Sequence, residues 1–345
     1  MTEQEQYEKV DMPFYRSEIE PLLPSEVLDF HAHFWTLEQW KENPFEKIKQ
    51  EDGGRYMVTS RNYPVEMLLR DAARILPGKV YKAVCFGNPT PSINVGATND
   101  YTEALAQKES LFPLILVGKH IISADEIRLR ISRSRIYGYK VFLPWIGDDY
   151  GTMRIEDMIS PEQMTVADEY NLVVLLHVPR SGRLADPVVQ EGVRRLSCDY
   201  PHAQIVLAHC GRCYLPDEME KAASHVRDLT NVSFDTSMVM DPTALQILLN
   251  EVGPRRLLFA TDFPVPAMRG RRVYVMDHWV DLVHTGYEES AFRVQSDNMR
   301  ASFMVYEIIL AIRRACDREG ISSGEMRRIF HDNGMEILRH VATKR

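Results

Sequence analysis

Short runs of apolar, often β-branched residues recur along this chain, and stretches with helical spacing separate them. Several runs are almost continuously apolar, such as Leu172-Val-Val-Leu-Leu176 and Ile205-Val-Leu-Ala208. Strands that are buried on both faces of a parallel sheet have this pattern. The pattern predicts eight strands, which are Val27–Phe34, Val80–Phe86, Leu111–Val117, Gly138–Leu143, Leu172–Val178, Gln204–His209, Val232–Thr236 and Arg256–Asp262.

The segments between these strands carry helix signals. Pro64–Leu76 places apolar side chains at helical spacing, and Ser123 precedes another helical pattern with Glu126 three residues further on, as in a capping box. Eight alternations of strand and helix close most economically into one ring. The fold class predicted is therefore α/β, a distorted (β/α)8 barrel of the TIM type.

The barrel accounts for most of the chain, and we expect one domain over residues 1–345. Residues 1–26 form an N-terminal extension before the first strand. Two segments, 36–63 after the first strand and 265–318 after the eighth, exceed what a barrel needs and are predicted insertions, the second with a long helix around Ser296–Arg314. Both follow strands, so both are expected at the carboxyl-terminal face where barrel active sites lie. A functional loop and a contact between copies of the chain are the alternatives.

Composition and charge restrict the partners. Hydrophobic residues make up 45% and charged residues 26% of the chain, as in ordinary globular proteins. The net charge of −8 comes from well-mixed charges, which indicates no nucleic-acid surface and no polybasic membrane anchor. No apolar stretch approaches the ~20 residues of a membrane span, and the polar N-terminus is unlike a signal sequence. With five cysteines, an odd number that favours a reducing compartment, the chain is predicted to be cytoplasmic.

Histidine and aspartate side chains stand at the carboxyl ends of the predicted strands. His31 and His33 are two residues apart on the first strand, so their side chains point the same way. His177, His209 and Asp262 end the fifth, sixth and eighth strands. These ends converge in a closed barrel, and a protein core does not bury so many ionisable groups unpaired. The set therefore predicts a metal site.

Five motifs, taken in this order, resemble the amidohydrolase superfamily and within it the amidohydrolase 2 family of metal-dependent hydrolases and decarboxylases. They are Asp29-Phe-His-Ala-His33, Leu176-His-Val-Pro179, Leu207-Ala-His-Cys-Gly211, Phe259-Ala-Thr-Asp-Phe-Pro264 and Ile329-Phe-His-Asp-Asn333. The resemblance implies one divalent metal ion, zinc being favoured over manganese and iron. It implies that His31, His33, His177 and Asp262 hold this ion, and that His209 acts near it as an acid or a base.

The residue types suit catalysis. Three nitrogen ligands, one carboxylate and an open position for water are typical of a catalytic zinc site. Asp262 can bind the metal or accept a proton from its water, and His209 is suited to acid–base work, so these two are the candidate catalytic residues. Asp29 lies one layer deeper, where it either orients an imidazole or bonds to the backbone.

Lys140, on the predicted fourth strand, has three interpretations. Some members of the superfamily carry a carboxylated lysine on this strand that bridges two metal ions, and the resemblance allows the same here. Lys140 could instead bind a substrate anion or point into the barrel wall. We favour a single metal ion.

Three arginines follow the candidate ligands and indicate the substrate. Arg180 and Arg183 come after His177, and Arg212 comes after His209. Guanidinium groups bind carboxylates with two parallel hydrogen bonds, so these residues, with Lys140, predict a small anionic substrate. The alternative is that the arginines pair with neighbouring acids such as Asp186 or Asp217.

The leading functional hypothesis is a metal-dependent hydrolase in which metal-bound hydroxide attacks an ester, lactone or amide carbonyl of a small carboxylated substrate. The alternative is a lyase, a non-oxidative metal-dependent decarboxylase of an aromatic or unsaturated carboxylic acid. Thr261-Asp-Phe-Pro264 resembles the motif of that subgroup, whereas several decarboxylases have glutamate where His31 stands. A third hypothesis is a metal-free barrel that only binds partners. The second insertion is also compatible with a homodimer.

Overall fold

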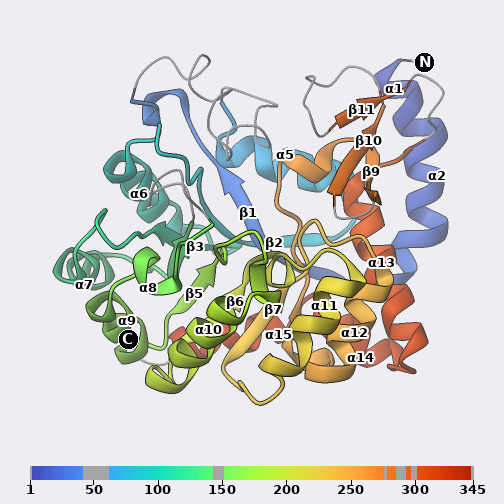
Figure 1. Cartoon of the computed structure of the whole chain (residues 1–345). Coiled ribbons are helices and arrows are strands. Elements are labelled where there is room, and N and C mark those ends of the chain that lie inside the picture. Colours follow the sequence, from blue (N-terminus) through green and yellow to red (C-terminus); the bar gives the residue numbers. More distant parts are fainter. Residues whose placement is uncertain are drawn as a thin grey trace.

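The computed structural model describes residues 2–41, 62–142, 151–275, 278–284, 293–296 and 301–342. Eight parallel strands pair in sequence order from β1 to β8 (Figure 1). This confirms the (β/α)8 barrel, and every predicted strand has its counterpart. The strands are β1 (Glu26–Phe34), β2 (Val80–Gly87), β3 (Leu111–Leu116), β4 (Gly138–Val141), β5 (Val173–Leu176), β6 (Gln204–Leu207), β7 (Val232–Asp235) and β8 (Leu257–Leu258).

The barrel closes through the residues that follow β8, because this strand is only two residues long. The N–H of Phe30 on β1 donates to the carbonyl oxygen of Phe259 at 2.9 Å, and the N–H of His33 donates to that of Phe263 at 3.0 Å. The segment just after β8 therefore takes the place of an eighth full strand beside β1. This brings the ends of β1 and β8 together.

Helices cover the outside of the barrel (Figure 1). The predicted start at Ser123 is confirmed, since its side chain accepts a hydrogen bond from the Glu126 N–H. In α12 the buried residues recur at helical spacing and face the core. The barrel helices are α5 (Val65–Ile75), α6 (Val95–Ala104), α7 (Ala124–Arg133), α8 (Ile155–Met158), α9 (Pro161–Glu169), α10 (Pro187–Asp199), α11 (Pro216–Ala222), α12 (Pro242–Val252), α14 (Ser323–Ile329) and α15 (Asp332–Ala342).

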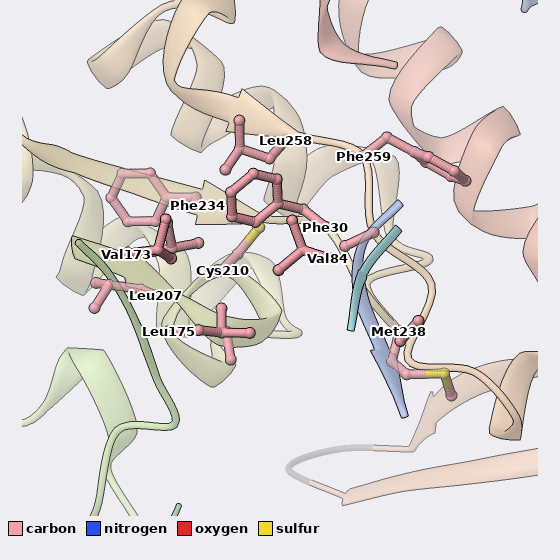
Figure 2. Close-up of a cluster of buried hydrophobic side chains, with 14 of the residues drawn as sticks. Phe30, Val84, Val173, Leu175, Leu207, Cys210, Phe234, Met238, Leu258 and Phe259 are labelled. Carbon is pink, nitrogen blue, oxygen red and sulfur yellow. The ribbon is translucent and has the colours of Figure 1, made fainter. Parts of the chain in front are cut away.

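Apolar side chains from successive strands pack into a continuous core (Figure 2). Phe30, Val84, Leu175, Leu207 and Phe234 come from five different strands and are each at most 2% exposed. Their burial explains why these strands read as apolar runs in the sequence. The polar side chains of the site occur where these runs end.

The segment after the barrel differs from the prediction. It forms a second sheet with strand order β11-β10-β9, built from β9 (Gly270–Val275), β10 (His278–Val283) and β11 (Arg293–Gln295). The helix that follows, α13 (Met304–Arg318), begins later than the predicted Ser296. Arg272 and Asp281 face each other across β9 and β10 as a buried ion pair, with 2.8 Å between Nε and Oδ1. The two charges interrupt the apolar pattern of these strands, and this explains why the sequence did not reveal them.

The N-terminal extension is helical and lies beside α13 (Figure 1). It begins with α1 (Glu3–Gln6) and α2 (Met12–Phe14), and the Tyr15 ring packs on Tyr306 of α13 with centroids 5.9 Å apart. Residues 42–61, most of the first predicted insertion, lie outside the described residues. Among the described residues, no helix is both long and apolar enough to cross a membrane.

Candidate active site

Two histidines and an aspartate meet where β1 ends beside the segment that follows β8. His31 Nε2 and His33 Nε2 are 3.3 Å apart. Asp262 Oδ1 lies 3.3 Å from His31 Nε2 and 3.0 Å from His33 Nε2. The Asp262 N–H donates to the His31 carbonyl oxygen at 2.8 Å, which fixes the aspartate beside β1. The predicted pairing of the first and last strand ends therefore produces a compact group of three possible metal ligands.

Hydrogen bonds on the far side of each ring determine which nitrogen faces this group. His31 Nδ1 lies 2.8 Å from Asp235 Oδ2, and His33 Nδ1 lies 3.3 Å from the Gly87 carbonyl oxygen. Carboxylate and carbonyl oxygens only accept, so we assign the ring proton to Nδ1 in both histidines. Each Nε2 then presents a lone pair. Three acceptors, the two Nε2 atoms and Asp262 Oδ1, consequently face one another at hydrogen-bond distance.

This donor set fits a divalent metal ion. Three acceptors in mutual contact repel one another unless a cation lies between them, and ligands at 2.0–2.2 Å from a tetrahedral zinc ion are about 3.3 Å apart. Burial and the nearby Lys140 charge lower the pKa of His31, and burial lowers that of His33, which keeps both imidazoles neutral. Burial opposes ionisation of Asp262, but the neighbouring His31 and His33 lower its pKa overall. Two neutral nitrogens and one carboxylate are thus available as ligands.

His209 and His177 extend this array of rings away from β1. The His209 ring centroid lies 5.0 Å from that of His31 and 5.2 Å from that of His177. His177 Nδ1 is buried without a hydrogen-bond partner among the described residues, so it is free to bind a ligand. His177 belongs to neither of the two compact groups of possible metal ligands that the described residues form. The structure places it beside His209 rather than in contact with Asp262.

The backbone around these residues is strained. His209, Cys210 and Arg212 have φ of +54°, +50° and +61°, in the left-handed region. This conformation costs about 1–2 kcal/mol for each residue other than glycine. Of the eight non-glycine residues with positive φ that the described residues contain, seven follow β5 to β8 at the carboxyl-terminal face, and they are Arg180, Arg183, His209, Cys210, Arg212, Met238 and Asp262. Strain concentrated in this way is typical of functional sites.

Lys140 lies in the site rather than in the barrel wall. Its side chain is fully buried, and Nζ is 3.2 Å from His31 Nε2 and 4.8 Å from the centre of the Phe86 ring. Burial lowers the pKa of Lys140 to about 8, against the opposing attraction of Asp235 and Asp262. The amine is therefore poised to exchange a proton near neutral pH.

The three predicted substrate arginines all have protein partners. Arg180 Nε donates to Asp186 at 2.7 Å, and Arg183 Nη1 donates to Glu218 at 2.6 Å. Arg212 Nη1 donates to the Arg180 carbonyl oxygen at 3.3 Å. Arg180 and Arg183 thus pair with nearby acids, which was the alternative to binding the substrate. Arg183 nevertheless keeps a buried Nε without a partner among the described residues.

An aromatic cluster adjoins His209. The Tyr214 ring centroid lies 6.1 Å from that of His209 and 6.4 Å from that of Tyr274, with which it stacks. The guanidinium groups of Arg183 and Arg272 lie 5.3 and 5.7 Å from the centre of the Tyr214 ring. Within the described part of the chain, the buried Tyr274 hydroxyl has no hydrogen-bond partner either. The second sheet therefore contributes Arg272 and Tyr274 to the surroundings of the site.

Sequence reasoning missed Asp235 and Ser237. Asp235 is the last residue of β7 and is fully buried, and Ser237 follows two residues later. Ser237 Oγ lies 2.8 Å from His209 Nδ1. The signal was present, since a carboxylate at the end of the predicted seventh strand occupies the same place as the candidate ligands on their strands.

Asp29 bonds to the backbone, the second of its two predicted roles. It accepts the N–H groups of His31 at 3.0 Å and Thr261 at 2.9 Å, and the hydroxyl groups of Thr261 and Tyr81. No imidazole contacts its carboxylate among the hydrogen bonds of the described residues. Asp29 joins β1 to the chain beyond β8 and so supports the ligands without touching them.

Comparison with known proteins identifies the family and supports the fold. A family model described as "Amidohydrolase" matches residues 28–339. No match was found among curated proteins. Three solved structures with the same fold are informative, and each covers nearly all of both chains.

The first is an amidohydrolase from Burkholderia multivorans with bound zinc, at 12% identity and a TM-score of 0.55, over 91% of this chain and 99% of that one. A proposed 2-pyrone-4,6-dicarboxylic acid hydrolase from Pseudomonas putida has 15% identity and a TM-score of 0.57, over 92% and 99%. A 2,6-dihydroxybenzoate decarboxylase in complex with 2,6-dihydroxybenzoate has 13% identity and a TM-score of 0.52, over 92% and 99%. At these identities the likenesses establish the fold alone.

Proposed function

Because this chain belongs to the amidohydrolase family, we propose that it is a metal-dependent hydrolase of a small anionic ester, lactone or amide. One observation carries the proposal. His31 Nε2, His33 Nε2 and Asp262 Oδ1 lie within 3.0–3.3 Å of one another as three acceptors, a geometry that a divalent cation satisfies. The zinc bound by the Burkholderia multivorans relative supports zinc as this cation.

We assign the metal ligands to His31, His33 and Asp262, with His177 completing the set from β5. A divalent ion bound there polarises a carbonyl oxygen and acidifies water. Its ligands are already suited to this task, since the histidines are neutral and the aspartate is ionised at neutral pH. The depressed pKa of Asp262 keeps the carboxylate ionised as a ligand and makes it a weak proton acceptor, so we assign proton transfer to His209.

His209 is the general acid–base group in this proposal. It is buried beside His31, and burial lowers its pKa, so that the neutral ring can accept a proton at neutral pH. Returning that proton to the leaving group completes the hydrolysis. A group that both accepts and donates must keep a fixed orientation, and the hydrogen bonds around His209 provide one.

The substrate proposed is a carboxylate with an unsaturated or aromatic body. The buried Arg183 Nε and Tyr274 hydroxyl lack partners among the described residues and both belong to side chains that contact Tyr214. Buried donors without acceptors cost about 1–3 kcal/mol each. Carboxylate oxygens of a substrate supply the missing acceptors, and the Tyr214 ring supplies an apolar face beside His209.

A second candidate, non-oxidative decarboxylation, is favoured by Lys140. The amine lies 3.2 Å from His31 Nε2 with its pKa lowered by burial to about 8, so at neutral pH it is mostly protonated and can deliver H⁺ to carbon. The 2,6-dihydroxybenzoate decarboxylase with the same fold shows that this barrel architecture also serves that chemistry. The two candidates share the metal ligands and differ in which residue moves the proton.

Metal analysis and a two-product assay test the proposal. Protein purified without chelator is expected to contain about one divalent ion per chain, and an empty protein that takes up none on titration would refute both candidates. The metal-loaded protein is then assayed on a panel of carboxylated lactones and aromatic carboxylates, with acid release and CO2 followed separately. Acid release without CO2 supports hydrolysis, and CO2 without a hydrolysis product would replace it with decarboxylation. His209→Gln should abolish the first activity and Lys140→Met the second.

A further inference from the structure

We propose that Asp235, acting with Ser237, is the residue that positions both His31 and His209 in the tautomer that the site requires. The two histidines have different tasks, metal binding and proton transfer, yet their Nδ1 atoms converge on the same buried pair of side chains. The inference rests on the proposed function, because it concerns the same site. It assigns a role to Asp235 at the end of β7, a residue that belongs neither to the five sequence motifs nor to the proposed metal ligands.

The Asp235 carboxylate accepts hydrogen bonds from four protein donors. His31 Nδ1–H donates to Oδ2 at 2.8 Å. The N–H groups of His209 and Ser237 donate to Oδ1 at 2.8 and 3.1 Å, and the Ser237 hydroxyl donates to the same oxygen. Oδ1 is thereby fully occupied, and Oδ2 bonds to His31, whose other nitrogen faces the candidate metal ligands. Although Asp235, His31 and His209 are close enough together to hold an ion, we assign Asp235 as a hydrogen-bonding partner of histidines rather than a ligand.

The Ser237 hydroxyl transmits this control to His209. Its single proton is given to Asp235, so Oγ can only accept from His209 Nδ1, which lies 2.8 Å away. The Ser237 carbonyl oxygen, 3.2 Å from the same Nδ1, is also an acceptor. His209 therefore carries its ring proton on Nδ1 and leaves Nε2 as the nitrogen that exchanges protons. His31 is held in the same tautomer directly.

Loss of an ordinary structural carboxylate would change only the stability of the fold. Loss of a positioning residue should also change the zinc affinity of the site and the tautomers of His31 and His209. Asp235→Asn separates the two roles. An amide group has one accepting oxygen, so either its NH2 faces His31 Nδ1 and drives the proton to Nε2, or it faces the N–H of His209 and Ser237. The substitution cannot satisfy both sides. Ser237→Ala leaves the His31–Asp235 hydrogen bond in place. It removes the hydroxyl, which lies 2.8 Å from His209 Nδ1 and 3.3 Å from His31 Nδ1, and keeps the residue 237 carbonyl oxygen as an acceptor for His209.

The test measures zinc affinity and tautomers rather than activity alone. Metal-free, full-length wild type, Asp235→Asn and Ser237→Ala are titrated with Zn²⁺ against a chromophoric chelator, after urea unfolding shows that each is folded. Loss of such an outer partner typically weakens metal binding by roughly 10–100-fold, which is the loss expected for Asp235→Asn, whereas Ser237→Ala should bind zinc within about threefold of wild type. Asp241→Asn is the matched control, because it removes a nearby carboxylate that caps α12, and asparagine caps as well.

The ¹⁵N spectra of histidine-labelled protein report the tautomers. His31 and His209 in the metal-free wild type should both give the Nδ1–H pattern. Asp235→Asn should change the pattern of at least one of them, whereas Ser237→Ala keeps the carbonyl acceptor of His209 and should keep its Nδ1–H form. With a substrate from the assay above, Ser237→Ala should lower kcat by roughly tenfold at unchanged KM.

Wild-type zinc affinity in Asp235→Asn would overturn the proposal. If Asp235→Asn does not fold, an Nε2–H form of His31 or His209 in the metal-free wild type overturns it instead. If the wild type binds no divalent ion, the proposed function fails, while the tautomers still decide the role of Asp235.

Discussion

Asp29 should contribute strongly to the stability of the barrel. Its Oδ1 accepts the N–H groups of His31 and Thr261 at 3.0 and 2.9 Å. Its Oδ2 accepts the hydroxyl groups of Thr261 and Tyr81 at 2.6 and 2.7 Å. The carboxylate is fully buried and joins β1 and β2 to the segment beyond β8, where the barrel closes without a full strand. The perturbation to make is Asp29→Asn, which keeps the shape and removes the charge. Burial raises the pKa of Asp29 to about 7, so the comparison is made well above this pH, where the carboxylate is ionised.

The expected magnitude follows from these four bonds. Asparagine retains one oxygen for the two backbone N–H groups but turns an NH2 toward two hydroxyl donors. Two hydrogen bonds to a charged acceptor are lost, at about 1.5–3 kcal/mol each, and reorientation of the hydroxyls recovers part of this. We expect a loss of about 2–4 kcal/mol in the free energy of unfolding. Asp29→Ala leaves four buried donors unpaired and should cost about 4–8 kcal/mol, close to the whole stability of an ordinary domain.

Urea unfolding of the metal-free protein, followed by tryptophan fluorescence, measures these losses. Tyr81→Phe is the matched control, because it removes one of the four donors and should cost only about 1 kcal/mol. In a double-mutant cycle, Asp29→Asn and Tyr81→Phe should couple by a similar amount. An Asp29→Asn protein within about 0.5 kcal/mol of wild type would refute the idea that this carboxylate secures the barrel closure.

The remaining predictions concern the metal and the site. Zinc at one hundred times its dissociation constant should stabilise the metal-free protein by about 2.7 kcal/mol, and an unchanged urea midpoint would contradict a native metal site. Asp262→Asn should abolish both zinc binding and turnover, since an amide replaces the charged ligand, and a fully active variant would refute the ligand assignment. Cys213→Ser should leave turnover unchanged because the hydrogen bonds given for the thiol are to backbone groups, those of Gly211, Leu184 and Ala185, and a loss in kcat would reveal a role for it. Acidification below pH 6.5 should destabilise the metal-free protein. Burial lowers the pKa of the site histidines in the folded state, so the unfolded chain binds protons first as the pH falls. The free energy of unfolding then drops by up to about 1.4 kcal/mol per pH unit for each histidine. A flat profile of unfolding free energy between pH 7 and 5 would contradict this, and the residues concerned are His31, His33, His177 and His209.

The barrel could be predicted because its strands are buried on both faces, which leaves a signal in each strand alone. β5, for example, is four buried apolar residues that follow the buried Leu172 and precede His177. The eighth strand was predicted over Arg256–Asp262, but the regular strand ends at Leu258. The residues beyond it bond to β1, and the Phe259 N–H donates to the carbonyl oxygen of Ile329, which is distant in sequence. Contacts of that kind cannot be read from one segment.

The site residues, too, include some that the sequence predicts and some that it does not. His31, His33 and Asp262 could be predicted, since strand periodicity and strand ends decide where they lie. The arginines could not, because their orientation depends on acids supplied by other elements, as Glu218 of α11 does for Arg183. Asp235 was missed for a related reason. Both histidines that its carboxylate bonds come from other strands, so this role cannot be inferred from the segment around Asp235.

His209 shows how the unpredictable part is built. The sixth strand was expected to end at His209, yet β6 ends at Leu207 and the chain turns left-handed at His209. This turn breaks the alternation of faces, so the direction of the ring cannot be inferred from the strand. The left-handed residues cost about 1–2 kcal/mol each, and the His209 N–H recovers part of that by donating to Asp235 at 2.8 Å. The carboxylate that fixes the two imidazole tautomers thus also stabilises the strained backbone that brings one of them into the site, so Asp235→Asn should lower both zinc affinity and unfolding free energy, whereas Ser237→Ala should leave most of the backbone contribution intact.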